Sequence, residues 1–268
     1  MSDFLQTMAV LSADRAATAG RLSSADLDKP LVPLRLADFD VIAELKDRSP
    51  AEGDLAARGS DRGARAREYT AGGAAAISVL TEPSKFSGSL SHLEEVVAAV
   101  PDTPVMRKDF LVEPVQILEA RKSGASGVLL IVTMLSDGKL REMLDCADEY
   151  GMFVLLESFD SDDLARVSGF LDNSQYQQRA ETGQLLFGVN TRNLRTLHVD
   201  PDRLAKLAAV LPAGRCVAES GLHDANDASS VAELGYRLAL VGTALMRSDD
   251  PATLVAAMRA AGSARIAA

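Results

Sequence analysis

Residues that bind metals or form disulfides are scarce in this 268-residue sequence. Its two cysteines, Cys146 and Cys216, lie far apart and have no CxxC companion, so neither a disulfide framework nor a zinc site is supported. The three histidines, His92, His198 and His223, lack a metal-ligand spacing such as HxxxH. We therefore expect no metal site, two reduced cysteines with structural roles, and histidines at the surface or at helix caps.

Clustered positive charge and long apolar runs are also missing. The net charge is −10 and the isoelectric point is near 4.9. These values argue against nucleic acid or an anionic membrane as a partner, because both call for clustered lysine and arginine. The N-terminus has no basic start followed by a long apolar core, and no apolar run reaches membrane-spanning length. The sequence predicts a cytoplasmic protein, a monomer or weak homo-oligomer, whose partner is a small molecule.

Eight short runs rich in β-forming residues recur along the chain. Each is almost continuously apolar instead of alternating, which is typical of parallel strands covered on both faces. They occupy residues 40–46, 74–80, 103–108, 126–132, 152–158, 185–190, 215–220 and 237–242. Helical patterns with polar faces lie between several of them, over residues 113–125, 137–151, 200–212 and 227–236. Glycine stands where a helix should stop, at Gly124, Gly151 and Gly235.

Strands that alternate with helices through short connections predict a closed (β/α)₈ barrel, an α/β fold. A doubly wound open sheet is the weaker alternative, because no GxGxxG follows the first strand. Since that strand begins near residue 40, residues 1–39 form an N-terminal extension, expected to be a helix or two over one mouth of the barrel. Such barrels reach this length as one domain, so we expect a single domain over 1–268, with the barrel at 40–268.

Charged and polar residues stand at the ends of several of these strands. In a (β/α)₈ barrel, the carboxyl ends of the strands point into the catalytic mouth. The residues at these positions are Glu44 and Lys46 (first strand), Lys108 (third), Glu157 (fifth), Asn190 and Arg192 (sixth), and Glu219 and Ser220 (seventh). Any one of them could be a solvated loop residue, but chance does not readily place so many on one face. A mouth that holds both lysines and carboxylates predicts a proton-transfer site.

Six segments closely resemble the indole-3-glycerol phosphate synthase family, in its order and at nearly its spacing. They are VIAELKDRSPAEG, AAAISVLTEPSKFSGSL, PVMRKDFLVEPVQILEARKSGASGVLLIV, GVNTRNLRTLHVD, VAESGL and LALVGTALMR. The resemblance implies a lyase of tryptophan biosynthesis that closes the ring of 1-(2-carboxyphenylamino)-1-deoxyribulose 5-phosphate, with loss of CO₂ and water, to give indole-3-glycerol phosphate. It implies neither a cofactor nor a metal.

The resemblance also implies catalytic roles. Lys108 resembles the general acid that protonates the ketone oxygen as negative charge grows there. Lys46 resembles a second lysine that holds the substrate carboxylate, and Glu157 resembles the base or acid of the dehydration. The polar groups that orient the lysines and the substrate are matched by Glu44, Asn190 and Glu219. Nearby carboxylates favour charged lysines while burial opposes the charge, and the sequence leaves open which of the two prevails.

Substrate-binding residues follow from the same resemblance. Gly221 and Gly242, after the seventh and eighth strands, leave backbone N–H groups accessible to a phosphate, although plain turn glycines remain the alternative. Thr243 adds a hydroxyl there, and Ser49 resembles a further phosphate contact. The polar lining is completed by Arg192 and Ser220. The apolar wall for the aromatic ring is expected to include Phe110, Leu129 and Leu194, for which core packing is almost as good an explanation.

The chain departs from the family pattern in places, and other functions are open. LLESF ends the fifth strand, Thr191 stands inside the NxR motif, and residues 168–184 form a longer, more polar link than usual. A specialised-metabolism paralogue with the same reaction is one alternative. Phosphoribosylanthranilate isomerase is another, but it needs a cysteine and an aspartate at strand ends, where neither cysteine lies. A non-catalytic barrel would be expected to have lost the lysines and glutamates, which are intact.

Overall fold

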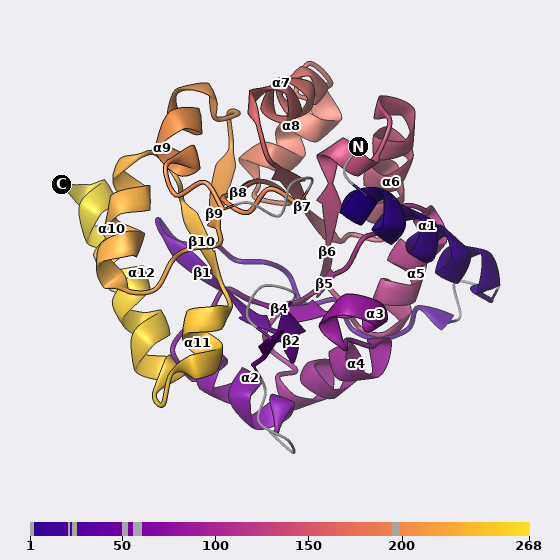
Figure 1. The fold of residues 1–268 in the computed structure, drawn as a ribbon, viewed down its shortest axis with the longest axis horizontal. Coiled ribbons are helices and arrows are strands. Elements are labelled where there is room, and N and C mark those ends of the chain that lie inside the picture. Colours follow the sequence, from indigo (N-terminus) through magenta and orange to yellow (C-terminus); the bar gives the residue numbers. More distant parts are fainter. Residues whose placement is uncertain (1–2, 21, 23–25, 50–52, 56–60, 195–198) are drawn as a thin grey trace.

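The computed structural model describes residues 3–20, 22, 26–49, 53–55, 61–194 and 199–268. Eight parallel strands close into a barrel, in the order β1, β10, β9, β8, β7, β6, β5, β4 (Figure 1). The strands are β1 (Asp40–Leu45), β4 (Ala76–Leu80), β5 (Val105–Lys108), β6 (Gly127–Ile131), β7 (Phe153–Ser158), β8 (Leu185–Asn190), β9 (Arg215–Glu219) and β10 (Leu238–Val241). Each lies within one of the eight predicted runs, so the predicted (β/α)₈ barrel is confirmed.

Helices surround the barrel (Figure 1). They are α1 (Asp3–Thr18), α2 (Arg62–Ala71), α3 (Pro83–Phe86), α4 (Leu90–Ala99), α5 (Pro114–Lys122), α6 (Asp137–Glu149), α7 (Ser161–Phe170), α8 (Ser174–Glu181), α9 (Arg203–Leu207), α10 (Ala225–Glu233), α11 (Thr243–Arg247) and α12 (Pro251–Ala267). Shorter elements are the antiparallel pair β2 (Arg48–Ser49) and β3 (Gly53–Asp54) and the 3₁₀ turns η2 (Val132–Met134) and η3 (Ala208–Val210). Within the described part of the chain, no helix combines the length and apolarity needed to cross a bilayer.

Helix ends follow the sequence signals with one exception. Gly124, Gly151 and Gly235 follow α5, α6 and α10 with φ angles of 95°, 65° and 101°. These left-handed values suit glycine, which has no Cβ to clash with the backbone. The helical pattern at 200–212 is realised only in part, because α9 covers five residues and passes into η3. Leu211 is then extended, with ψ of 137°, since a residue before proline avoids the helical region.

The strands are buried on both faces, which explains their apolar runs. Successive side chains of a strand point to opposite sides. Those that point inward fill the barrel with the residues Ile42, Ala76, Met106, Leu129, Ile131, Phe153, Leu155, Leu186, Val217, Leu238 and Leu240. Those that point outward, such as Val41 and Ala43, pack under the helices. A strand covered on both sides needs no polar face until it reaches the mouth.

The N-terminal extension reaches both ends of the barrel. Helix α1 lies at the carboxyl ends of the strands, where Phe4 lines the same pocket as Lys108 (Figure 1). Residues 26–39 run along the opposite end, where the backbone N–H of Val32 donates to the Ser126 hydroxyl (3.0 Å) just before β6. The expectation of a helix over one mouth is therefore confirmed.

The polar segment 168–184 folds mainly into helix α8. Arg179 of this helix donates hydrogen bonds to the carbonyl oxygens of Leu144 (3.0 Å) and Met152 (2.8 Å), and Met152 directly precedes β7. Tyr176 is buried, and its hydroxyl donates to Asp145 (2.7 Å). Helix α8 thus packs at the amino ends of the strands, away from the carboxyl-end mouth.

We expect α8 to serve stability and not turnover. Replacing residues 173–184 by a short glycine-containing link removes a large buried aromatic side chain, whose loss alone costs about 3–5 kcal/mol. Urea unfolding should register this loss, while kcat at saturating substrate should change much less. The exposed substitution Gln178→Ala is the control and should alter neither quantity. A shortened protein that stays folded but loses nearly all turnover would contradict this placement.

Candidate active site

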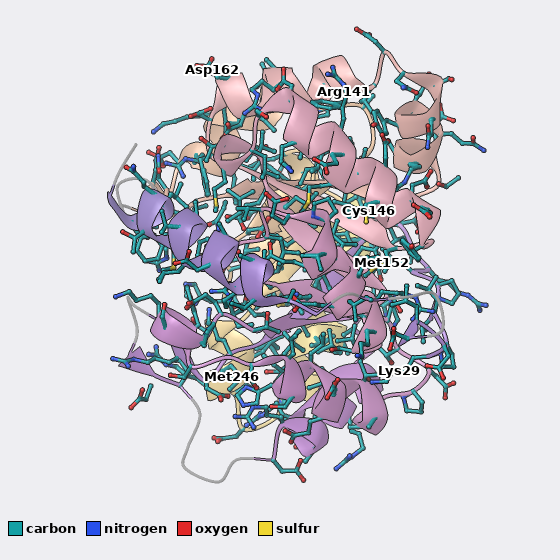
Figure 2. The ribbon with its side chains drawn as sticks, turned by 90° about the vertical axis from the view of Figure 1, so that its right-hand side faces the viewer. Lys29, Arg141, Cys146, Met152, Asp162 and Met246 are labelled. Atoms are coloured by element: carbon teal, nitrogen blue, oxygen red, sulfur yellow. The ribbon has the colours of Figure 1, made fainter. Side chains whose placement is uncertain are left out.

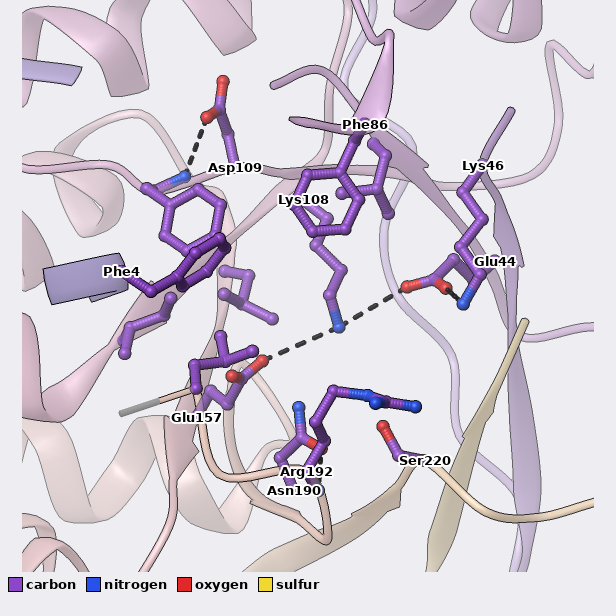
Figure 3. A pocket seen from close by; sticks show the side chains of 15 residues that line it. Phe4, Glu44, Lys46, Phe86, Lys108, Asp109, Glu157, Asn190, Arg192 and Ser220 are labelled. Carbon is purple, nitrogen blue, oxygen red and sulfur yellow. Dashed lines mark hydrogen bonds and ion pairs between the residues drawn. The ribbon is translucent and has the colours of Figure 1, made fainter. Parts of the chain in front are cut away.

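A cavity of about 230 Å³ opens at the carboxyl ends of the barrel strands. Seven of the predicted strand-end residues line it, namely Glu44, Lys46, Lys108, Glu157, Asn190, Arg192 and Ser220 (Figure 3). The eighth, Glu219, is fully buried and touches Lys108. The residues that the sequence placed at five strand ends therefore meet at one site.

Four of these side chains form a single layer of the barrel interior, contributed by the alternate strands β1, β5, β7 and β9. Glu44 is level in register with Met106, two residues before Lys108. The same rise of two residues leads from Lys108 to Glu157, on to Glu219, and back to Glu44. One circuit thus rises by eight residues, the shear of this barrel type. A layer usually filled by branched apolar side chains here holds one ammonium group and three carboxylates.

Lys108 lies at the centre of this layer. Its Nζ is 3.1 Å from Glu219 Oε2, 3.5 Å from Glu44 Oε2 and 3.6 Å from Glu157 Oε2. Lys46 approaches from the rim, with its Nζ 2.7 Å from the other oxygen of Glu44. Figure 3 shows the ammonium group of Lys108 between the carboxylates of Glu157 and Glu44. The carboxylates therefore hold both lysines in the mouth.

The protonation of Lys108, which the sequence left open, follows from this geometry. Burial by itself would lower the pKa of Lys108, but the carboxylates of Glu219, Glu44 and Glu157 raise it above its ordinary value. Burial acts on Glu44 in the opposite sense, raising its pKa, yet the two ammonium groups bring the pKa below its ordinary value. Lys108 is therefore a cation with a proton to give, and Glu44 is an anion.

Glu219 behaves differently because burial dominates. Burial raises the pKa of Glu219, the ammonium group of Lys108 opposes this rise, and the carboxylate of Glu157 adds to it, so that the pKa of Glu219 is about 8. The space for its carboxyl group comes from Gly188 on the neighbouring strand β8, where a Cβ would collide with Glu219 Oε1. The carboxyl group of Glu219 therefore keeps its proton to a higher pH than an ordinary glutamate does.

The turns after β8 and β9 present polar groups to the same cavity. Asn190 is buried, and its Oδ1 accepts a hydrogen bond from the backbone N–H of Arg192 (2.9 Å), which fixes the turn. Ser220 has a φ of 68°, a left-handed conformation that is uncommon outside glycine. Strain of this kind persists where surrounding contacts enforce it, often at functional sites. In Figure 3, Asn190, Arg192 and Ser220 lie together on one side of Lys108.

A second cavity of about 270 Å³ adjoins the first and contains the predicted phosphate-binding residues Gly221, Gly242 and Thr243. It shares five residues with the first cavity, namely Glu44, Lys46, Lys108, Arg192 and Ser220. A Cβ on Gly242 would collide with Glu44 Oε1 and lie 2.9 Å from Lys46 Nζ, so this glycine is needed for space. Gly221 has a φ of 74°, which a turn glycine explains equally well. The side chain of Ser49, in β2, lies outside the described residues.

An apolar wall closes the other side of the first cavity. Phe110, Leu129 and Leu194 line it, and they also pack in or against the core of the barrel. Sequence reasoning missed Phe4 and Phe86, whose ring centroids lie 5.9 and 6.1 Å from that of Phe110. Phe86 could have been suspected from its place in the family-like segment TEPSKFSGSL. Phe4 carried no such signal.

The cysteines lie outside both cavities, whereas His223 lines the second cavity. Cys146, on α6 in the outer layer (Figure 2), and Cys216 are free, and burial raises the pKa of these thiols to about 11 and 12. His92 lies in the first turn of α4, and the backbone N–H of His223 donates to Asp227; His198 lies outside the described residues. Among the residues that the structure describes, no group of three His, Cys, Asp or Glu is arranged to hold a metal ion.

A (β/α)₈ barrel whose carboxyl-end mouth gathers lysines, carboxylates and a glycine-lined cradle defines an acid–base enzyme for an anionic substrate. The family model described as indole-3-glycerol phosphate synthase matches residues 29–258. The chain belongs to this family, and the enzymes of this family are carboxy-lyases.

Individual relatives agree with this assignment. The indole-3-glycerol phosphate synthase of Nocardioides sp. is 45% identical over 235 residues, which cover 86% of this chain and 85% of the relative. That of Leifsonia xyli subsp. xyli is 42% identical over 255 residues, or 93% of each chain. Among solved structures, 3-hexulose-6-phosphate synthase from Salmonella typhimurium has a TM-score of 0.61 at 17% identity, covering 85% of this chain and 99% of its own. At that identity the likeness shows the fold alone.

The raised pKa of Glu219 predicts a pH-dependent stability. The folded state binds this proton more tightly than the unfolded state, so Glu219 contributes stability below pH 4.5 that is lost as the pH rises to about 8. For one proton the slope is at most about 1.4 kcal/mol per pH unit. Glu219→Gln cannot titrate, so its unfolding free energy, measured in urea across this range, should depend less on pH. The control Glu142→Gln removes an exposed carboxylate; if both variants keep the wild-type slope, Glu219 is not the titrating group.

Proposed function

We propose that this site converts 1-(2-carboxyphenylamino)-1-deoxyribulose 5-phosphate into indole-3-glycerol phosphate, CO₂ and water, a step of tryptophan biosynthesis. One observation carries the proposal. The ammonium group of Lys108 stands among three carboxylates, between an apolar cavity and a glycine-lined cavity that share five residues. The apolar cavity suits an aromatic ring, the cradle suits a phosphate, and the reacting carbons of the substrate lie between those two groups.

Ring closure is assigned to Lys108. The aromatic carbon that bears the carboxylate attacks the ketone carbon, and negative charge develops on the ketone oxygen. A fixed cation with a transferable proton stabilises this oxygen and then protonates it. Lys108 is such a cation, because the surrounding carboxylates keep it charged despite burial. Its low tendency to lose the proton is offset when the acceptor is an alkoxide, which is far more basic than a ketone.

Lys46 is assigned to the substrate carboxylate. It lies at the rim beside Glu44, half-buried, where its ammonium group can pair with an incoming anion. Loss of CO₂ then returns the electron pair of the breaking C–C bond to the ring system, which restores aromaticity. Holding the carboxylate until that point favours the geometry in which the bond breaks.

Dehydration is assigned to Glu157, with the remaining polar groups in orienting roles. The hydroxyl formed in ring closure leaves as water once it is protonated, and a proton is lost from the new ring. Glu157 lies 3.6 Å from Lys108 and lines the cavity, so it can exchange protons with Lys108 and with the substrate. The groups that orient the lysines and the substrate are Glu44, Asn190 and Glu219. Each proton transfer falls to a side chain of this protein, and no cofactor or metal is proposed.

The two cavities hold the two ends of the substrate. The phosphate is assigned to the backbone around Gly221 and Gly242, with Thr243 and Ser49 as hydroxyl donors, because backbone N–H groups free of bulky side chains suit a dianion. Arg192 and Ser220 line both cavities, so they are assigned to the carbon chain of the substrate that joins its aromatic ring to its phosphate. The aromatic ring is assigned to the wall formed by Phe110, Leu129 and Leu194.

A cytoplasmic location and a monomeric or weakly associating state belong to the same proposal. Both cysteines are free thiols, as is usual in a reducing compartment. The net charge of −10 makes copies of the chain repel one another. The isomerase alternative finds no support, since Cys146 lies in α6 and Cys216 lies near the amino end of β9.

The activity itself is tested with purified protein and the carboxyphenylamino substrate, without added metal. Indole fluorescence should rise with time, and the protein adds little background because it has no tryptophan. Release of one CO₂ per indole formed should accompany the signal. Consumption of substrate without indole, or no consumption at all, would overturn the proposal.

The two lysines should differ in kinetics. Lys108→Met removes a general acid, worth about 10²–10⁴-fold, and a fixed charge at the oxyanion, worth about 10²–10³-fold, in turnover. These factors do not multiply, because one group supplies both. Lys46→Met should mainly raise KM, with a loss in kcat only if Lys46 also transfers a proton. Steady-state kinetics, with circular dichroism to verify folding, separate the two; a Lys108→Met enzyme with more than about a tenth of wild-type kcat would rule out the acid role.

A further inference from the structure

Helix α1 presents one continuous face to the mouth of the barrel. Phe4, Met8, Ser12 and Arg15 are spaced four, four and three residues apart, which places them along the same side of a helix. Met8 and Ser12 are buried, and the Ser12 hydroxyl accepts a hydrogen bond from the side-chain amide of Gln116 (2.8 Å). Phe4, at one end of this face, lines the active-site cavity. Arg15, at the other end, does not.

Arg15 joins α1 to two elements that carry active-site residues. Its Nη2 lies 2.7 Å from Asp109 Oδ1, and Asp109 directly follows Lys108. Its Nη1 lies 3.8 Å from Glu82 Oε1. The Glu82 side chain caps helix α3, which carries Phe86, by accepting hydrogen bonds from three backbone N–H groups. A single guanidinium group thus bridges α1 to the connections after β4 and β5.

Both carboxylates keep other partners when Arg15 is removed. Asp109 still accepts hydrogen bonds from Arg107 (3.1 Å), from the Thr81 hydroxyl (2.8 Å) and from the backbone N–H of Phe110 (2.8 Å). Glu82 likewise keeps its bonds to the first turn of α3. Neither carboxylate is left without a hydrogen-bond donor, and an unsatisfied buried group is what costs most. Arg15 is therefore not needed to hold these loops together, and its specific effect is on α1.

The other end of the same face completes the aromatic wall. Phe4 meets Phe110 edge-on, with ring centroids 5.9 Å apart and an interplanar angle of 74°. Phe86 contacts Phe110 from α3 at 6.1 Å. Phe110 and Phe86 belong to the barrel loops, so Phe4 is the one ring of the three that is brought in by α1. Figure 3 shows Phe4 and Phe86 in the same pocket, above the ammonium group of Lys108.

We propose that Arg15 is a positioning residue for the aromatic end of the substrate: its bridge to Asp109 and Glu82 locks α1 across the mouth and thereby seats Phe4 against the ring. The inference rests on the proposed function. If α1 only covered the barrel, its ion pair would not need to lie beside Lys108, yet Arg15 pairs with Asp109, the residue after Lys108. Arg15 acts through the helix and touches no reacting atom.

Arg15→Gln tests the proposal through binding and kinetics. Loss of the aromatic contact should raise KM by about three- to tenfold, the range expected for one edge-to-face ring pair, with kcat little changed. The dissociation constant of 2-(ethylamino)benzoate, followed by the fluorescence of this ligand, should rise by the same factor. The inhibition constant of inorganic phosphate should stay as in the wild type. Arg15→Lys keeps the charge and should recover part of the loss.

Arg259→Gln is the matched control. The pair Arg259–Asp40 has an N–O distance of 2.8 Å, with side chains 33% and 2% exposed, against 2.7 Å, 28% and 0% for Arg15–Asp109. Asp40 begins β1, at the end of the barrel opposite the active site. Both substitutions should lower the melting temperature by similar amounts, but only Arg15→Gln should weaken binding of the aromatic ligand.

A double variant tests whether Arg15 acts through Phe4. If Arg15 acts through Phe4, then Arg15→Gln combined with Phe4→Ala should bind 2-(ethylamino)benzoate no more weakly than Phe4→Ala alone. Additive losses, an unchanged KM in Arg15→Gln, or a fall in kcat at constant KM would each overturn the proposal. Failure of the wild type to form indole would overturn the proposed function instead, and the binding comparison would still report on Arg15.

Discussion

The ion cluster around Lys108 is the constraint on which the rest of the site depends. Charges in a barrel interior are costly unless they are paired, and Lys108 meets three carboxylates within 3.6 Å. The cluster occupies the top layer of the barrel, where the register gathers one residue from each alternate strand. The four groups of this cluster therefore come from strand residues, whereas Lys46, Arg192 and Ser220 come from the connections that follow β1, β8 and β9.

This layer also dictates which neighbours must be small. Gly188 leaves room for the carboxyl group of Glu219, and Gly242 leaves room for Glu44 beside Lys46. Either Cβ would displace a carboxylate from a lysine. Gly242, which follows β10, thus has two effects. It leaves the ion cluster undisturbed, and it exposes its backbone to the second cavity. The boundary between the two cavities is therefore formed by the backbone of Gly242 together with the ion pair of Glu44 and Lys46.

Much of the fold and most of the polar site could be predicted from the sequence. Each strand is a compact apolar run, and the polar residue that ends it, such as Lys108 or Glu157, is visible as a break in that run. The depth of Glu219 was not visible, because it depends on the shear that brings four distant strand ends into one layer. Nor was Phe4, since its place depends on how α1 docks, which is set by tertiary contacts such as Arg15 with Asp109. That the whole chain forms one domain stays a prediction.

The site combines two parts: the ion cluster around Lys108 at its centre and the aromatic wall formed by Phe4, Phe86 and Phe110. The centre is built by strand residues, and its carboxylates raise the pKa of Lys108. The aromatic wall is shared between barrel loops and α1, a helix more than twenty residues away from β1 in the sequence. The N-terminal extension therefore contributes Phe4 to the lining of the cavity.

The central claim, that the carboxylates outweigh burial and keep Lys108 charged, can be measured directly. Lysine labelled with ¹³C at Cε gives one NMR signal per residue, and Lys108→Arg identifies that of Lys108. If the carboxylates prevail, Lys108 remains protonated at a pH where an ordinary lysine, with a pKa of about 10.4, has lost its proton. A Lys108 signal that titrates below that value in the folded protein would show that burial prevails, and would contradict the account.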